Sequence, residues 1–369
     1  METKDKKHSS TSWKYTAVVM VLALLTWVLT LLGKDNPEKV EQIYSSYLYP
    51  FIIKKIGSVT GLLPFAIGEI LVFTLIVIII MGTLYALIKP GIVIKNAKKI
   101  FHVVIRVLGL AYILFYFIWG FNYFRQDYMT LAEMSVESAT LKDLENLTLE
   151  VIAKANEVRI GLNENEEGIF FIEEDFKTLG KKAEDGFENY YVGERNLGGN
   201  YGKAKPLKIS KWMSYTGITG IYFPYTVEPN VNIDIPHANI PATMSHEMGH
   251  QRGFAREDEA NLIAYMACTN SPHPEFQYSG YYLALQYLLG DMHKQDQVLY
   301  SQVTLKISDA VKRDMNDEYD YWKSREGKAE EVATTLNDNY LKANNQGAGV
   351  QSYNGVVKLL LAEYLTRAN

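Results

Sequence analysis

Three long apolar runs in the first third of the chain limit its possible folds more than any other feature of the sequence. They occupy about residues 15–33, 67–88 and 103–123. A helix of about 20 apolar residues crosses the hydrocarbon core of a bilayer. Arg106, near the start of the third run, has a side chain long enough to reach an interface. We therefore predict an N-terminal membrane domain, residues 1–125, with three transmembrane helices in contact with the lipid bilayer.

The first run also has the basic start of a secretory signal peptide. A signal peptide ends at a cleavage site with small residues, and no such site follows this run. Two further apolar runs do follow it. We therefore predict an uncleaved anchor.

Lysine is concentrated in two segments that three spans would place on the same side of a membrane. Lysine-rich flanks stay in the cytoplasm, which predicts a multi-pass protein of the cell membrane with a cytoplasmic N-terminus. The domain after the third span, residues 126–369, would then be extracytoplasmic. Aromatic residues 115–124 are expected to form a belt at the outer interface. The lysines are Lys4, Lys6, Lys7, Lys14, Lys89, Lys95, Lys98 and Lys99.

Charge and cysteine content exclude several classes of function. The net charge is −5 and no basic stripe is present, so no nucleic-acid partner is expected. The single cysteine, Cys268, excludes a disulfide within the chain and a cysteine-rich zinc site. Three spans with almost no buried polar residues argue against a transporter or channel. The sequence carries no signal of the oligomeric state.

The residues after 126 predict a mostly α, α+β domain with a small sheet ahead of its main motif. Stretches 207–212 and 220–235 are rich in β-forming residues, and their prolines indicate an edge or bulged strand. Helical spacing of apolar residues follows from Pro241 onward. The helices are expected at about 242–251, 256–270, 278–294, 296–324, 328–343 and 352–367.

The motif His246-Glu247-Met248-Gly249-His250 carries the strongest chemical signal in the sequence. Residues four apart lie on one face of a helix, so both imidazoles can reach a single Zn²⁺ ion. Zinc bound there would lower the pKa of a water to about 7. Glu247 lies beside the first histidine and is the predicted catalytic general base.

A third protein ligand is expected on the next helix. The metzincin pattern requires a histidine at position 256, where this sequence has arginine. Glu257 and Asn261 follow at i, i+4 spacing, and Gly253 allows the chain to turn between the helices. We predict Glu257 as the third zinc ligand and Asn261 as the hydrogen-bond partner of a ligating histidine. Glu259, on a different face of that helix, is the alternative ligand.

These residues resemble two kinds of known family. The pattern HEMGH followed by REDEAN resembles the gluzincin-type HExxH and ExxA[DN] motifs. It is similar to the CAAX prenyl protease, heat-shock membrane protease and ImmA/IrrE-type families. Residues 119–125, 220–236 and 245–265 also resemble an uncharacterised bacterial family of three-span membrane proteins, a domain of unknown function. The resemblance implies a zincin-like domain.

We therefore predict a membrane-anchored zinc metallopeptidase that hydrolyses protein or peptide substrates at the outer face of the membrane. The alternative is a catalytically silent zinc-binding sensor or cell-envelope assembly factor. Glu228 and Asn232 on the expected edge strand are candidates for substrate contact. Glu69, at the end of the second span, is expected to be solvated. The candidates for stabilising an oxyanion are Tyr278, Tyr281, Tyr282, His273 and His237.

Overall fold

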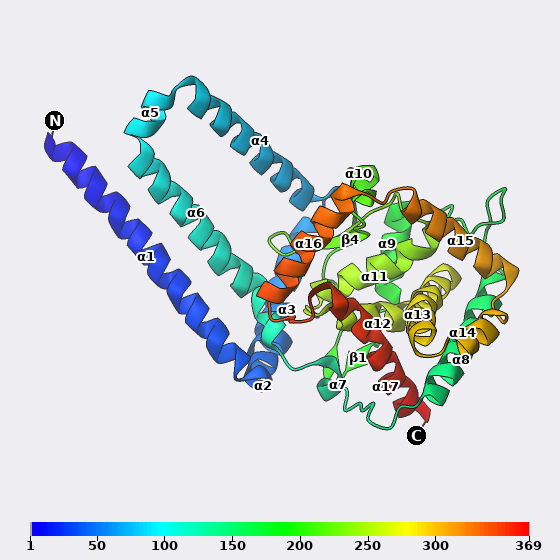
Figure 1. Cartoon of the computed structure of the whole chain (residues 1–369). Helices are drawn as coiled ribbons and strands as arrows, with labels where there is room; N and C mark the ends of the chain where they lie inside the picture. The colour runs from blue at the N-terminus through cyan, green and yellow to red at the C-terminus, as the bar shows by residue number, and fades with distance from the viewer. Residues whose placement is uncertain (1, 369) are drawn as a thin grey trace.

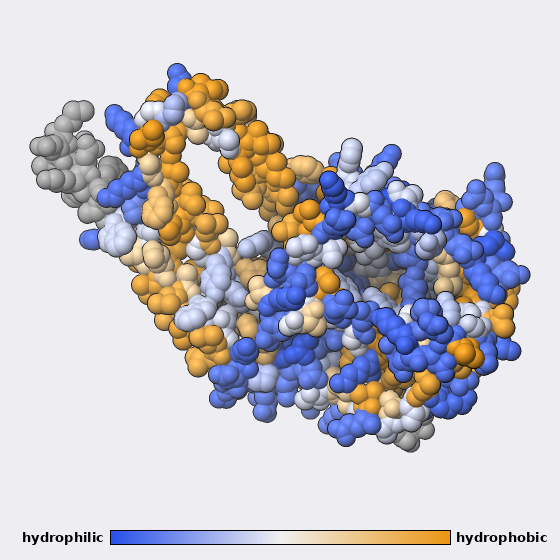
Figure 2. Space-filling model, viewed as in Figure 1, coloured by the Kyte–Doolittle hydropathy of each residue, from blue (hydrophilic) through white to orange (hydrophobic). Residues whose placement is uncertain are grey.

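Three long helices extend from one side of a mostly helical body (Figure 1). The computed structural model describes the backbone of residues 2–368 and the side chains of residues 13–367. The helices are α1 (Glu2–Lys34), α4 (Ile67–Ile88) and α6 (Ala97–Ile118), and each contains 22 residues that are apolar enough to cross a membrane. Figure 2 shows apolar side chains over their visible faces, whereas the body is mostly hydrophilic. The prediction of three apolar helices is confirmed.

The ends of these helices alternate between the body and a distant tip. The short helix α5 (Pro90–Lys95) joins α4 to α6 at the tip, and α1 packs along α6 (Figure 1). The lysines around α5 therefore lie at the end of the spans away from the body. The start of α1 lies at the same end.

The third helix ends earlier than predicted, at Ile118 rather than residue 123. Residues Gly120–Phe124 form the 3₁₀ helix η2. Trp119, Phe121 and Tyr123 are buried in a cluster with Tyr44 and Tyr49. The predicted aromatic belt is therefore wrong for these three residues, because they pack inside the protein.

The segment between the first two spans packs against the body. It contains α2 (Pro37–Lys39), the π-helix η1 (Val40–Leu48) and α3 (Tyr49–Thr60). The Tyr44 hydroxyl donates to the carbonyl of Phe117, and the Ser45 hydroxyl donates to Asn122. The Tyr49 hydroxyl donates to the carbonyl of Gln251, in the body. A domain boundary at residue 125 stays a prediction, and this earlier segment already contacts the body.

Two glutamates attach the start of α4 to the body. Glu228 accepts hydrogen bonds from the backbone amides of Ile67 and Gly68, at 3.1 and 2.9 Å. A carboxylate is favoured there because the first amides of a helix have no partner within the helix. Glu69 accepts from the amide of Ile209 at 2.9 Å. The expected substrate contact of Glu228 is therefore wrong, because this carboxylate is buried, whereas Glu69 is half-buried and keeps partial contact with solvent.

The body is a helical core with small sheets. Helix α13 (Pro274–Gln295) packs against α8 (Leu141–Arg159), α11 (Ile240–Gln251) and α12 (Glu257–Thr269). In one sheet, β5 (Glu228–Val231) lies between β3 (Lys205–Pro206), which is parallel to it, and the antiparallel β4 (Gly220–Phe223). Strands β1 (Tyr191–Val192) and β2 (Arg195–Asn196) form a separate hairpin. The predicted small sheet ahead of the motif helix is confirmed. The remaining helices ahead of α11 are α7 (Tyr128–Leu131), α9 (Phe176–Asp185), α10 (Ser210–Ser214) and η3 (His237–Asn239).

Most of the later helices lie where the apolar spacing predicted them. The exception is 296–324, which is two helices, α14 (Gln297–Thr304) and α15 (Asp309–Lys323), because Ser308 caps a new helix start. Helix α16 (Lys328–Ala343) agrees with the prediction. The last segment starts as the 3₁₀ helix η4 (Gly349–Gly355) before α17 (Val356–Ala368). The stretch 207–212 was predicted as a strand, but it enters α10.

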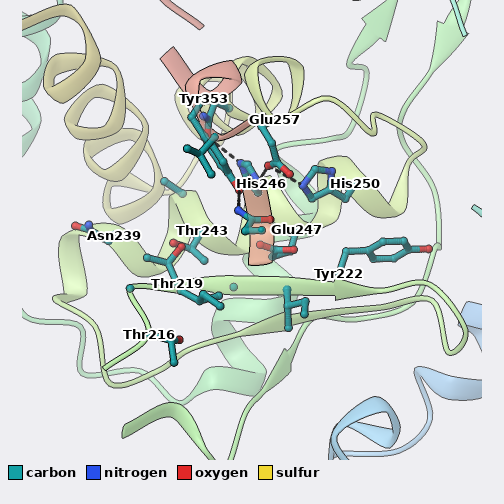
Figure 3. Close-up of a pocket in the computed structure, with 18 of the residues that line it drawn as sticks. Thr216, Thr219, Tyr222, Asn239, Thr243, His246, Glu247, His250, Glu257 and Tyr353 are labelled. Carbon is teal, nitrogen blue, oxygen red and sulfur yellow. Dashed lines mark hydrogen bonds and ion pairs between the residues drawn. The ribbon is translucent and has the colours of Figure 1, made fainter. Parts of the chain in front are cut away.

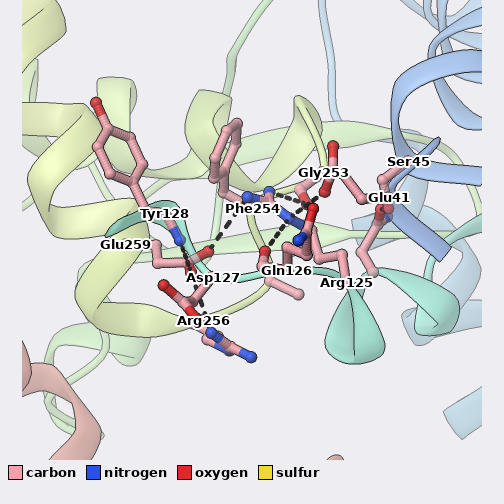
Figure 4. Close-up of polar contacts among 12 residues, drawn as sticks. Glu41, Ser45, Arg125, Gln126, Asp127, Tyr128, Gly253, Phe254, Arg256 and Glu259 are labelled. Carbon is pink, nitrogen blue, oxygen red and sulfur yellow. Dashed lines mark hydrogen bonds and ion pairs between the residues drawn. The ribbon is translucent and has the colours of Figure 1, made fainter. Parts of the chain in front are cut away.

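A buried guanidinium joins the base of the third span to the body (Figure 4). The Arg125 side chain lies 3.0 Å from a carboxylate oxygen of Glu41 and 3.8 Å from one of Glu259. It also donates to the carbonyl of Gly253 at 3.1 Å and lies over the ring of Phe254. This single side chain therefore links η1, the segment after α6 and the turn before α12.

We expect Arg125→Met to destabilise the protein by about 3–5 kcal/mol, because it removes a buried cation that pairs with two buried carboxylates, Glu41 and Glu259. Thermal unfolding of the full chain in detergent measures the loss. Lys154→Met removes an exposed ion pair with Glu157 and serves as the matched control, for which no measurable shift is expected. Equal unfolding midpoints for the two variants would contradict the role given to Arg125.

Candidate metal centre

The motif lies on α11, which is enclosed by β4 and β5 on one side and by α12 on the other. Gly249 permits the close approach of α12, since a Cβ at this position would lie 3.2 Å from the Ile263 side chain. The chain leaves α11 through Gly253, whose φ of +90° is a left-handed conformation that favours glycine. The resulting turn brings Glu257, the first residue of α12, back over the histidines.

Three ligand atoms converge between the two helices (Figure 3). The Nε2 atoms of His246 and His250 lie 3.2 and 3.3 Å from Oε2 of Glu257. One ligand atom from each residue lies within 4.8 Å of the others. The structure therefore brings together the three predicted ligands as a possible metal-binding group.

Hydrogen bonds determine which nitrogen of each imidazole faces the centre. Nδ1 of His250 lies 2.7 Å from the carbonyl oxygen of Phe254, which can only accept, so this nitrogen carries the proton of the neutral ring. Nδ1 of His246 lies 2.8 Å from Oδ1 of Asn261, whose amide nitrogen donates to the hydroxyl of Tyr287. Both neutral rings therefore present a bare Nε2 to the Glu257 carboxylate.

Three lone pairs directed at one region require a cation. Two imidazole nitrogens and one carboxylate oxygen are the ligand set of catalytic zinc sites, which keep a further position open. The hydrogen bonds to Nδ1 are the kind of support that orients ligating histidines. The residues present therefore fit Zn²⁺.

The pKa values reflect the same convergence in the metal-free protein. Burial opposes ionisation of His250, but the Glu257 carboxylate outweighs it and raises the pKa of His250 to about 9. Burial would raise the pKa of Glu257, but the two imidazoles outweigh it and hold that pKa well below its usual range. Without a metal, a proton shared among these groups takes the place of the cation.

Glu247 lies beside the group, between α11 and β4 (Figure 3). Its side chain is 4% exposed, and Oε2 has no hydrogen-bond partner among the described residues. Burial raises the pKa of Glu247 to about 7, although the two histidines and the Tyr222 backbone amide oppose this rise. Gly220 on β4 allows the close approach, since a Cβ there would overlap the Glu247 carboxylate.

The group opens into a cavity of about 1230 Å³. His246, Glu247, His250, Glu257 and Asn261 all line it. Its walls come from β4, α13, α16 and η4, and they extend to the end of α6. The predicted site residues therefore share one solvent-accessible space large enough for several residues of a substrate.

The alternative ligand, Glu259, lies outside this group. Its Oε1 accepts from the amide of Tyr128 at 2.7 Å, and its carboxylate also pairs with Arg125 and Arg256. These partners turn Glu259 toward the base of the third span. The geometry therefore favours Glu257 over Glu259 as the third ligand, and the ligand roles themselves remain proposals.

Most of the oxyanion candidates point elsewhere. The hydroxyls of Tyr278 and Tyr282 donate to Asp314 and Glu318, and of the five candidates only Tyr282 lines the cavity. His273 pairs with Asp185, and Nδ1 of His237 accepts from the amide of Ile172. Tyr281 packs at the ring edge of Tyr265. Asn232, the other expected substrate contact, is buried and donates to Ser214 and to the carbonyl of Ile218.

Sequence reasoning missed a tyrosine that lies close to the group. Tyr353, on η4, lies next to Glu257 and His246 in the cavity (Figure 3). Burial and the Glu257 carboxylate raise the pKa of Tyr353 well above its usual value, so it remains a hydrogen-bond donor at neutral pH. No local pattern marks this residue, because α16 and η4 return over the site from the far end of the chain.

The fold and these side chains define a mostly helical protein with three candidate membrane spans and a possible His-His-Glu metal site. The family described as "Protein of unknown function (DUF3810)" matches residues 44–361, and the chain belongs to this family. The matched residues include α4, α6 and the whole group. The predicted membership of a family of unknown function is thereby confirmed. No curated protein and no solved structure matches the chain.

We expect the purified full chain to bind about one zinc ion, as a three-ligand site requires. His246→Ala and His250→Ala should lose the metal. Glu257→Gln and Glu259→Gln form a matched pair of buried residues two positions apart, and only Glu257→Gln should lose affinity. Asn261→Ala should weaken binding about 10–100-fold. Metal analysis and competitive zinc titration measure these outcomes, and full affinity in Glu257→Gln would assign the third ligand elsewhere.

Proposed function

We propose that this protein is a membrane-anchored zinc-dependent metallopeptidase. The observation that carries the proposal is the buried Glu247 carboxylate, which stands in the cavity beside the His-His-Glu group. A site that only binds metal has no need of a second carboxylate that is not itself a ligand. Holding a buried acid without a hydrogen-bond partner for one of its oxygens is costly, and perturbed acids of this kind are common at catalytic sites.

Glu247 fits the role of general base. Zn²⁺ held by the three ligands would supply Lewis acidity and lower the pKa of water to about 7. The Glu247 carboxylate lies beside the three ligands in the cavity (Figure 3), so it can accept a proton from the attacking water and return it to the leaving amine. The protonated phenol of Tyr353 is available to donate a hydrogen bond to the developing oxyanion.

The edge of β4 supports a polypeptide as the substrate. Tyr222 lies opposite Pro229, which has no N–H, so this pair exchanges no mutual hydrogen bonds. The Asn232 amide donates to the carbonyl of Thr219, so the backbone groups of Thr219 point toward the β5 side. Backbone groups of successive residues point to opposite sides of a strand, so those of Gly220 and Tyr222 point the other way. The backbone groups of Gly220 and Tyr222 therefore face away from β5, and the Tyr222 amide faces the Glu247 carboxylate in the cavity. An extended chain can pair with such an edge.

The lysine distribution supports an orientation for this activity. The body lies at the opposite end of the spans from α5 and its lysines. If the lysine-rich end is cytoplasmic, as such ends usually are, then the body and its cavity lie outside the cytoplasm. We propose that hydrolysis takes place at the outer face of the membrane.

We expect Glu247→Gln to keep zinc and to lower hydrolysis about 10²–10⁴-fold, the usual contribution of a general base. The zinc-loaded full chain in detergent is incubated with a detergent extract of cell membranes, and new N-termini are identified by mass spectrometry. Gly220→Ala should also lower turnover without loss of zinc, because its methyl group displaces the Glu247 carboxylate. Identical termini from wild type and Glu247→Gln, both with zinc bound, would favour the silent sensor or assembly factor.

The orientation predicts accessibility to a membrane-impermeant maleimide. The native Cys268 is fully buried and should not react, so any labelling can be assigned to an introduced cysteine. In intact cells Lys154→Cys, on the body, should be labelled, and Lys95→Cys, in α5, should be labelled only after permeabilisation. The reverse pattern would place the site in the cytoplasm.

A further inference from the structure

One wall of the cavity is built from the third span itself. Phe115, in the last turn of α6, lines the cavity together with Trp119. The β4–β5 turn adds Tyr225, whose hydroxyl donates to the carbonyl of Ala111 inside α6 at 3.1 Å. The space that holds the His-His-Glu group is therefore continuous with the surface of a membrane-spanning helix.

A helix with few buried side chains, α16, forms another wall of the cavity. Ala333, Thr334 and Asn337 of α16 line the cavity, while Leu341 is the only residue of this helix that is buried. The helix is held at its end by a hydrogen bond of 3.0 Å between the hydroxyls of Tyr340 and Tyr123. In Figure 1, α16 lies on the side of the body from which the spans extend.

Helix α16 also carries an exposed apolar stripe. Val332, Leu336 and Tyr340 follow one another at intervals of four residues, so they lie on one face, and they are 59%, 65% and 42% exposed. Leu336 and Tyr340 also line the cavity, so the stripe reaches its mouth. An apolar helical face beside a bilayer is typical of segments that lie in the membrane interface.

The charged side chains that line the cavity away from its centre are acidic. Glu318 and Glu330 line the cavity at α15 and α16, in addition to Glu247 and Glu257 at the centre. No lysine or arginine among the described residues lines it. The cavity therefore disfavours an acidic segment and accepts a neutral or basic one.

We propose that the substrate is a polypeptide anchored in the same bilayer and cut in a neutral or basic segment next to its anchor. The anchor lies against the end of α6, the segment passes under α16, and its backbone adds to β4. This inference rests on the proposed peptidase function. One C–N amide bond breaks, and water supplies hydroxyl to the carbonyl carbon and hydrogen to the amine. A lipid substrate would use the apolar wall but not the outward-facing backbone groups of β4.

The first test compares new protein N-termini in cells that carry wild type or Glu247→Gln, after metal analysis shows zinc in both. We expect the Glu247-dependent termini in membrane-anchored proteins, within about 10 residues of the apolar anchor, roughly 33 Å of extended chain. Glu247-dependent termini confined to soluble proteins, or far from any anchor, would overturn this inference and leave the peptidase function standing.

Two other outcomes are also decisive. Absence of any Glu247-dependent terminus would refute the peptidase function and this inference with it. A Glu247-dependent change in lipid composition without peptide cleavage would show that the substrate bound in the cavity is a lipid.

The second test uses a protein identified by the first. The full enzyme is reconstituted in lipid vesicles and offered that protein with its anchor or without it. Confinement to one bilayer raises the effective concentration, so removal of the anchor should lower the cleavage rate about 100-fold. Replacing basic residues of the cut segment with glutamate should also slow cleavage of the anchored form. Equal rates with and without the anchor would overturn the inference.

Discussion

The turn at Gly253 is the constraint on which the rest of the site depends. It reverses the chain between α11 and α12, so a carboxylate seven residues after His250 can face both imidazoles. A guanidinium from the base of the third span holds this turn: Arg125 donates to the carbonyl of Gly253 and pairs with Glu259. The candidate metal ligands and the candidate membrane spans are therefore parts of one packed structure.

That connection gives the membrane spans more than an anchoring role. Tyr49, in the segment between α1 and α4, donates to the carbonyl of Gln251 at the end of the motif helix. Glu228, on the central strand β5, binds the first amides of α4. A shift of the spans would therefore move α11 and the sheet on either side of Glu247. Cutting the chain after the third span would remove partners of the site as well as its anchor.

Local patterns in the sequence predicted the parts of the structure that depend on nearby residues. Apolar runs gave the spans, and i, i+4 spacing placed His246, His250, Glu257 and Asn261 on facing helices. Contacts between distant segments left no such pattern. The partners of Glu228 are backbone amides in the second span, so its role does not follow from neighbouring residues. The helix α6 ends at Ile118 because Trp119 packs against Tyr49 and Tyr222, which are also distant in the sequence. The cavity walls formed by α16 and Tyr353 also come from segments that are distant in the sequence from the motif helix.

The same convergence of lone pairs that suits a metal would also hold a proton when no metal is bound. Neutral histidines would leave two bare nitrogens against the Glu257 carboxylate, so the metal-free protein retains a proton there, and the pKa of His250 rises to about 9. The stability gained from that proton is full below the ordinary histidine pKa of about 6.5 and is lost as the pH rises through about 9. Metal and proton compete for one place, since a ligating imidazole must give up its proton. The hydrogen bonds to Phe254 and Asn261 serve both states, because they hold the rings in the same orientation whichever cation is present.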